Sequence, residues 1–151
     1  MLFRSDVTAA GGPALQLSEV SRGAAFGDID NDGDVDIVVS NNNGPARLML
    51  NEVGSRKNWL SVRLEGVKSS RQALGGRIAV LRPGQKPLWR RVHTDSSYLS
   101  ASDPRVHFGL GDDRGPVTVL VVWPDGSRET WEGVSAGAFV SLRQGSGRPA
   151  R

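Results

Sequence analysis

The chain has 151 residues, with 19 Lys and Arg against 16 Asp and Glu, a formal net charge of +3, and no cysteine. The absence of cysteine excludes a disulfide framework, thiolate catalysis and thiolate metal sites. No apolar run approaches the roughly 20 residues of a membrane-spanning helix, and the basic residues are scattered without a nucleic-acid-binding motif. We therefore expect no membrane span and no nucleic-acid partner. The first residues, Met1–Asp6, lack the basic-then-apolar pattern of a signal peptide.

The N-terminal third of the sequence predicts a linker followed by a small antiparallel meander. Residues 1–22 show weak periodicity around a Gly-Gly-Pro turn, which is typical of a linker or partial strand. Residues 23–52 form one unit, in which an acidic loop and an Asn-Gly turn separate short β-prone segments. The expected strands are 23–26, 36–40 and 46–51. Three strands alone bury too little apolar surface to be stable, so this unit needs a neighbour.

Five aspartates fall between positions 28 and 36 with the spacing of a calcium loop. Carboxylates at loop positions 1, 3, 5 and 9 and a carbonyl at position 7 are the hard oxygen ligands that Ca²⁺ prefers, and Gly33 stands at position 6, where the chain must turn sharply. The predicted ligands are the carboxylates of Asp28, Asp30, Asp32 and Asp36 and the backbone carbonyl of Asp34. We expect Ca²⁺ as the cofactor because the ion offsets the repulsion among these carboxylates.

The loop is not a complete EF-hand. Position 12, which carries a bidentate Glu in an EF-hand, is Val39 here, and the residues around it are β-branched and apolar. The loop is therefore expected to enter a strand rather than a helix, which weakens a reading as a regulatory calcium sensor. The alternative is a solvated acidic turn that binds nothing.

The remainder predicts a second, larger β unit over residues 57–143, after a polar boundary at 52–58. Alternating apolar and polar residues, with closely spaced turn signals, are typical of half-buried strands. The expected strands are 60–64, 77–82, 88–93, 106–110, 117–123, 127–131 and 138–143. We place Val117–Trp123 centrally, buried on both faces, because it is almost entirely apolar. No helix is expected, and the Gly- and Arg-rich tail 144–151 is expected to be disordered. The fold class is all-β, with a sandwich or barrel.

Two segments resemble known families. Phe26-Gly27, followed by the aspartate series 28–36, resembles the FG-GAP repeat of the integrin or VCBS type. The resemblance implies a calcium loop within one blade of a β-propeller, a fold used in extracellular recognition and adhesion. A propeller needs about 4–8 blades, so this chain is expected to have missing propeller blades upstream as partners.

The second unit resembles the ASPIC/UnbV domain. The matching segments are Asn58-Trp59-Leu60, Gly75-Gly76-Arg77, Ser97–Ser100, Ser102–Gly111 and Trp123-Pro124-Asp125-Gly126. The resemblance implies the C-terminal part of a larger exported protein, located outside the cell or in the periplasm. It does not supply a ligand.

The sequence offers only weak catalytic candidates. Ser97 or Ser100, His107 and Asp103 could form a Ser-His-Asp arrangement, but no G-x-S-x-G motif occurs, and a structural histidine is the simpler interpretation. The expected function is therefore a non-catalytic calcium-binding recognition or structural module with an unknown protein or glycan ligand. Its alternatives are a glycan-binding module or a small hydrolase. The aromatic residues that could form a sugar-stacking platform are Trp59, Trp89, Trp123, Trp131 and Tyr98.

Overall fold

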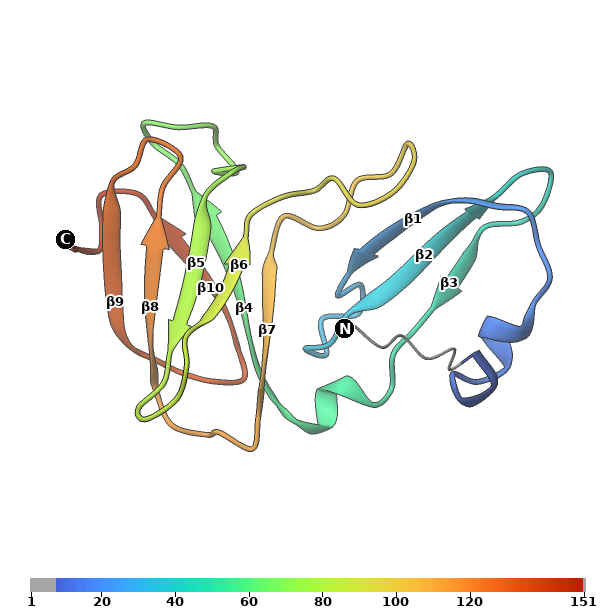
Figure 1. Cartoon of the computed structure of the whole chain (residues 1–151), viewed down its shortest axis with the longest axis horizontal. Helices are drawn as coiled ribbons and strands as arrows, with labels where there is room; N and C mark the ends of the chain where they lie inside the picture. Colours follow the sequence, from blue (N-terminus) through green and yellow to red (C-terminus); the bar gives the residue numbers. More distant parts are fainter. Residues whose placement is uncertain (1–7, 151) are drawn as a thin grey trace, which may run out of the picture.

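The computed structural model describes residues 8–150. These residues form strands and short 3-10 turns with no α-helix, which confirms the all-β prediction. The strands lie in two lobes side by side (Figure 1). No helix in this described part has the length and apolar character that a membrane-spanning helix requires. The 3-10 turns are η1 (Thr8–Ala10), η2 (Pro13–Gln16) and η3 (Gly54–Arg56).

The first lobe is the predicted antiparallel meander, in the order β1-β2-β3. Its strands are β1 (Ser21–Gly27), β2 (Asp36–Asn41) and β3 (Arg47–Met49). The third strand is shorter than the expected 46–51. The reason is that the N–H of Asn51 donates to a carboxylate oxygen of Asp36, 2.9 Å away, and so leaves the strand ladder.

Part of the predicted linker 1–22 is held against this meander. Glu19 accepts hydrogen bonds from the guanidinium of Arg47 at 2.6 Å and from the amide of Asn41 at 2.8 Å. The pKa of Glu19 is lowered by these partners, chiefly by the hydrogen bond from Arg47. Residues 1–7 of the predicted linker lie outside the described residues.

The second lobe contains two facing sheets, with strand orders β10-β4-β7 and β11-β9-β8-β5-β6. Its strands are β4 (Asn58–Glu65), β5 (Arg77–Leu81), β6 (Leu88–Arg91), β7 (Val106–Gly111), β8 (Val117–Val122), β9 (Arg128–Val134), β10 (Ala138–Arg143) and β11 (Arg148–Pro149). Strands β4 and β10 pair in parallel, and the other pairs are antiparallel.

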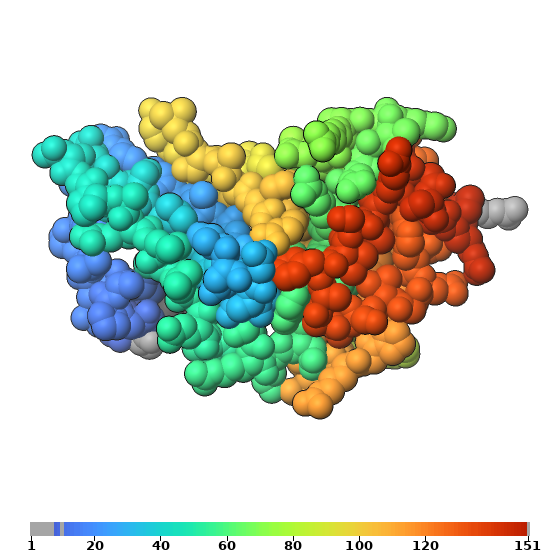
Figure 2. All heavy atoms as spheres, turned by 180° about the vertical axis from the view of Figure 1, so that it is seen from behind, coloured from blue at the N-terminus to red at the C-terminus, as the bar shows by residue number. Residues whose placement is uncertain are grey.

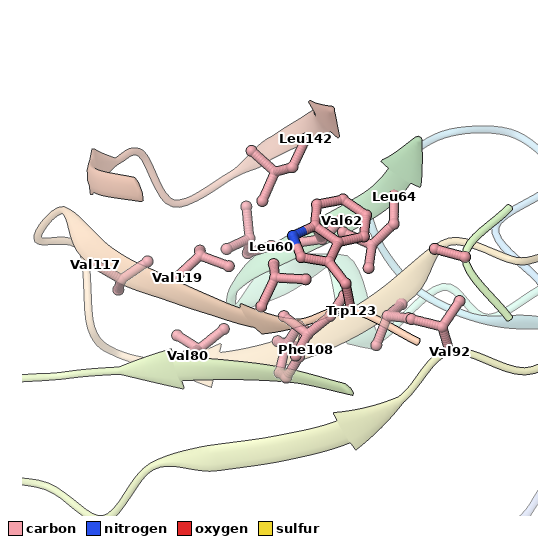
Figure 3. Close-up of a cluster of buried hydrophobic side chains, with 14 of the residues drawn as sticks. Leu60, Val62, Leu64, Val80, Val92, Phe108, Val117, Val119, Trp123 and Leu142 are labelled. Carbon is pink, nitrogen blue, oxygen red and sulfur yellow. The ribbon is translucent and has the colours of Figure 1, made fainter. Parts of the chain in front are cut away.

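The core of the second lobe lies between these sheets. Leu60, Val62 and Leu64 on β4 point inward at every second position, as the alternation predicts, and each is at most 2% exposed. Trp123 and Phe108 are the largest side chains in this core (Figure 3). Burying one such large apolar side chain contributes about 1.5–3 kcal/mol, so this cluster is the main source of stability.

The prediction that Val117–Trp123 is buried on both faces is wrong. Strand β8 is central, between β9 and β5, but buried and half-buried residues alternate along it. Thr118 and Leu120, for example, are half-buried. The opposite sheet covers only the inner face of β8. The apolar composition of β8 therefore predicted more burial than the strand has.

The prediction of a disordered tail is also wrong for residues 144–150. The carboxylate of Glu129 accepts the N–H groups of Gly145 and Gly147, each at 2.8 Å. The side chain of Gln144 donates to Asp125 at 2.9 Å, and β11 then pairs with β9. Long-range hydrogen bonds fix this segment despite its Gly- and Arg-rich composition. Residue 151 lies outside the described residues.

Candidate metal centre

The acidic loop connects β1 to β2, and both of its ends are fixed by strand pairing. Gly27 is the register partner of Asp36, so the residues between them must form a compact turn. Asp28 and Asp36 are buried, whereas Asp30 is exposed. Gly33 has φ of +99°, a left-handed backbone conformation that L side chains rarely adopt. The turn predicted at this glycine is therefore present.

Three of the four predicted carboxylate ligands converge. One carboxylate oxygen each from Asp28, Asp30 and Asp36 lies within 4.8 Å of the others, a separation that one cation could bridge. The carboxylate of Asp32 is outside this group, and one of its oxygens accepts the N–H of Asp34 at 3.2 Å. The predicted ligand atom of Asp34 is its backbone carbonyl, which this grouping of carboxylates does not include. The calcium assignment of all five residues stays a prediction.

The carboxylate of Asp34 has a role that the sequence did not indicate. One of its oxygens accepts the N–H of Ser55 at 2.9 Å and so holds the η3 turn against the loop. The side chain is buried, and its other oxygen has no hydrogen-bond partner among the described residues. Burial is the main cause that raises the pKa of Asp34, and the nearby charges of Asp32, Asp36 and Asp28 raise it further. The loop is thus a region of concentrated negative charge.

Backbone donors orient the other buried carboxylates. Asp28 accepts the N–H groups of Asp32 and Gly33, at 3.1 and 2.9 Å. Asp36 accepts the N–H of Ile29 at 2.8 Å in addition to that of Asn51. Each carboxylate oxygen has two lone pairs, so one N–H bond leaves capacity for a cation. The same bonds would also order a metal-free turn, so the solvated-turn alternative stays open.

The loop packs on the outer face of the β10-β4-β7 sheet. The pairing registers place His107, Ser61 and Phe139 side by side across its three strands. Trp59 lies on the same face, 4.8 Å from the ring of Phe139. A Cβ atom at Gly33 would lie only 1.8 Å from the indole of Trp59. The absence of a side chain at Gly33 therefore allows this contact.

Arg105, just before β7, connects the two lobes. Its guanidinium donates to the backbone carbonyl of Asp28 at 2.7 Å and to the side-chain oxygen of Asn31 at 2.8 Å. Its Nε donates to Asp103 at 2.5 Å, and its guanidinium lies 4.9 Å from the ring centre of Phe139. Sequence reasoning missed this residue because nothing local relates it to a loop more than seventy positions away.

The β6–β7 connection covers the outer edge of β1. Phe26 donates its N–H to the hydroxyl of Ser102 at 3.1 Å, and its carbonyl accepts the N–H of Asp103 at 2.9 Å. A Cβ atom at Gly23 would lie 2.6 Å from the carbonyl oxygen of Tyr98. From behind, the yellow atoms of this connection lie between the blue and green parts of the molecule (Figure 2). The meander and the sandwich are therefore packed together, not merely joined by a linker.

Comparison with known proteins identifies the second lobe. The family described as ASPIC and UnbV matches residues 66–149. The chain belongs to this family. In the structure the ASPIC and UnbV fold also includes β4, which precedes the matched residues but pairs with both β10 and β7.

Curated relatives of this ASPIC and UnbV chain are named cartilage acidic protein 1. The protein from Xenopus tropicalis is 31% identical over 118 residues, and those from Homo sapiens and Mus musculus are 30% identical over the same length. Each comparison covers 76% of this chain but 18% of the relative. The chain thus spans less than a fifth of these relatives. The FG-GAP interpretation of residues 23–52 stays a prediction.

The ASPIC and UnbV lobe does not assemble the Ser-His-Asp arrangement. The hydroxyl of Ser100 donates to the carbonyl of Tyr98 at 3.0 Å, and Asp103 is paired with Arg105. His107 makes no hydrogen bond with these residues or with Ser97 in the described part of the chain; its Nδ1 is buried without a partner. The residues considered for a hydrolase therefore have other structural contacts.

The aromatic residues lie in separate places rather than on one platform. Trp123 and Trp131 make an edge-to-face pair at 6.4 Å, and Trp59 packs under the acidic loop. Trp89 lies beneath the guanidinium of Arg77 on β5, and Tyr98 is exposed on the β6–β7 connection. This arrangement does not favour the glycan-binding alternative in the form that the sequence suggested.

Proposed function

We propose that this chain is a non-catalytic recognition or structural module in which an FG-GAP-like repeat, residues 23–52, binds Ca²⁺ and packs on the ASPIC and UnbV lobe. The observation that carries the proposal is the convergence of the Asp28, Asp30 and Asp36 carboxylates within 4.8 Å. Part of the binding free energy of the ion becomes folding free energy, because the ligands come together only in the folded loop.

The open side of the meander supports a larger assembly. Strand β3 has one neighbouring strand, β2, in the described part of the chain. Leu48 on β3 and Leu50 just after it are half or more exposed. A further propeller blade upstream would cover such an edge. The relatives, of which this chain spans less than a fifth, leave room for additional repeats. The name of these relatives refers to cartilage, which supports the proposed location outside the cell. If the protein is bacterial, the corresponding exported location is the periplasm.

Calorimetric titration of the chelator-treated protein with Ca²⁺ and Mg²⁺ tests the metal assignment. We expect one saturable site that prefers Ca²⁺, because a loop with many oxygens suits the larger ion. Asp30→Asn should weaken Ca²⁺ binding at least about tenfold, because affinity depends on the charge of the ligand set. Saturating Ca²⁺ at about 100 times its Kd should stabilise the fold by about 2.7 kcal/mol.

Glu52→Gln is the matched control. Glu52 is exposed, lies near the loop in sequence and makes no hydrogen bond or ion pair within residues 8–150. Its replacement should leave the heats unchanged. Equal heats from the wild type and Asp30→Asn would refute the assignment, and a loss caused by Glu52→Gln would place the ion elsewhere.

A further inference from the structure

A pocket of about 290 Å³ lies at the seam between the lobes. The first lobe contributes Phe26 and Val35, and the second contributes His107, Arg90 and Val106. This volume is near the lower end of the roughly 300–1,000 Å³ of small-molecule sites. Both lobes are needed to form its walls, so the pocket exists only when the meander is seated on the sandwich.

The charged groups around the pocket leave one cation without a partner. Arg105 is paired with Asp103, and Arg91 is paired with Asp95 at 3.2 Å. Arg90 is exposed and makes no side-chain hydrogen bond or ion pair with any residue in the described range 8–150. An anionic group in the pocket would therefore find an unpaired guanidinium, whose planar donors suit a carboxylate or a sulfate.

Asp28 lines the pocket, but its carboxylate is hydrogen-bonded within the acidic loop. The carboxylate oxygens of Asp28 accept the backbone N–H groups of Asp32 and Gly33. Its backbone carbonyl is covered by Arg105. The remaining acid, Asp103, is neutralised by the same arginine. The charge of Asp28 still acts on His107 in the pocket wall, but neither Asp28 nor Asp103 forms an ion pair with Arg90 among the described residues.

His107 lies in the same wall. Its Nδ1 is buried and has no hydrogen-bond partner in the described structure, a condition that costs free energy. Burial is the main cause that lowers the pKa of His107; the charge of Asp28 raises it, and the charge of Arg90 lowers it. A neutral imidazole carries one donor and one acceptor.

We propose that this seam pocket binds a small organic anion, in which a carboxylate or sulfate-type group pairs with Arg90 and a compact body with an apolar face packs between Phe26, Val35 and Val106. The inference rests on the proposed recognition role, for which it names a ligand class, but it does not depend on calcium coordination. A ring of about six atoms suits the volume of the pocket. An aromatic acid and an acidic sugar share this chemistry.

The test is a titration of the ¹⁵N-labelled full chain followed by NMR, at constant ionic strength. The probes are benzoate, benzenesulfonate and glucuronate, with benzyl alcohol and glucose as neutral counterparts. We expect saturable shifts at the amides of Gly27, Ser61, Ser96 and His107 with at least one organic anion and none with the neutral counterparts. Tightest binding of benzoate or benzenesulfonate would indicate an aromatic acid as the ligand class, and tightest binding of glucuronate would indicate an acidic sugar.

Two arginine variants decide the role of Arg90. Arg90→Gln should weaken binding of the best probe at least about tenfold, because the charge-assisted hydrogen bonds to the anion are lost. Arg114→Gln is the control: Arg114 is also exposed and without a hydrogen bond or ion pair in the described residues, but it lies outside the pocket lining. The Arg114→Gln variant should bind the best probe with the same affinity as the wild type.

The remaining outcomes overturn the proposal. Equal binding of benzyl alcohol would exclude an anion-selective site, and inorganic sulfate binding as tightly as the organic anions would exclude the apolar contact. Retained affinity in Arg90→Gln, or an equal loss in Arg114→Gln, would exclude pairing at this arginine. Each titration is run with and without saturating Ca²⁺, because Asp28 and Val35 of the pocket lining belong to the acidic loop. Absence of anion binding in both conditions would overturn the pocket proposal, whereas the calorimetric heats test the calcium assignment independently.

Discussion

Gly33 combines two constraints at a single residue. Its backbone has φ of +99°, and an added Cβ atom would lie 1.8 Å from the indole of Trp59. The first constraint was visible in the sequence, because position 6 of a calcium loop requires a sharp turn. The second was not, because it depends on a sheet that forms from residues far along the chain.

We expect Gly33→Ala to destabilise the protein by about 2–4 kcal/mol, which combines left-handed backbone strain with overpacking. Gly126→Ala is the matched control, because Gly126 also has a left-handed φ, +86°, but no atom lies within 4 Å of an added Cβ. That control should cost about 1–2 kcal/mol from strain alone. Urea denaturation of both variants measures the difference. Equal losses would mean that the loop does not contact Trp59 in solution.

At the scale of the element, the segment Ser102–Gly111 holds the acidic loop in place. Arg105 at its start bonds the carbonyl of Asp28 and the side chain of Asn31, and it is mostly buried. Arg105 is thus a positioning residue for the loop and does not itself coordinate a cation.

We expect Arg105→Gln to lower the free energy of unfolding by about 2 kcal/mol, because charge-assisted hydrogen bonds in a partly buried site contribute about 1.5–3 kcal/mol each and are not additive. It should also weaken Ca²⁺ binding. Arg148→Gln, which breaks an exposed ion pair with Glu132, should cost less than about 1 kcal/mol and leave calcium affinity unchanged. Thermal unfolding and calorimetry measure both quantities. If Arg148→Gln lowers the free energy of unfolding as much as Arg105→Gln does, the contacts of Arg105 between the lobes contribute no more to stability than an exposed ion pair.

Individual strands were predictable because burial on one face imposes an alternation that survives in the sequence. Leu60, Val62 and Leu64 show that alternation directly. The parallel pairing of β4 with β10 was not predictable, because their partners are chosen by the closure of the whole sandwich. For the same reason the sequence indicated the acidic loop but neither Arg105 nor the ordered tail held by Glu129.

At the scale of the whole molecule, the seam couples the two lobes. The loop rests on Trp59, and the β6–β7 connection rests on β1. A cation bound by the loop stabilises only states in which the loop is folded. Its effect should therefore extend to the parts of the second lobe that touch the first.

Hydrogen exchange with and without Ca²⁺ tests this coupling. We expect calcium to slow exchange over residues 26–50 and also over 96–105, while the core strands β4 and β8 change little because their protection comes from the sandwich itself. Exchange in Asp30→Asn should not respond to the ion. Protection confined to residues 26–50 would contradict coupling across the seam, and uniform protection of all strands would indicate one cooperative unit.

The two attachments between the lobes also have a mechanical consequence. The chain crosses once through residues 50–57, and the β6–β7 connection adds a second, noncovalent attachment on the edge of β1 (Figure 1). Two separated points of attachment restrict rotation of one lobe about the other, which a single flexible crossing would permit. Under tension, we expect residues 50–57 to extend only after their own hydrogen bonds to Asp34 and Asp36 and those at Phe26 break, and Gly33 separates from Trp59. The resistance of the molecule to stretching is therefore set by the seam rather than by the length of the crossing segment.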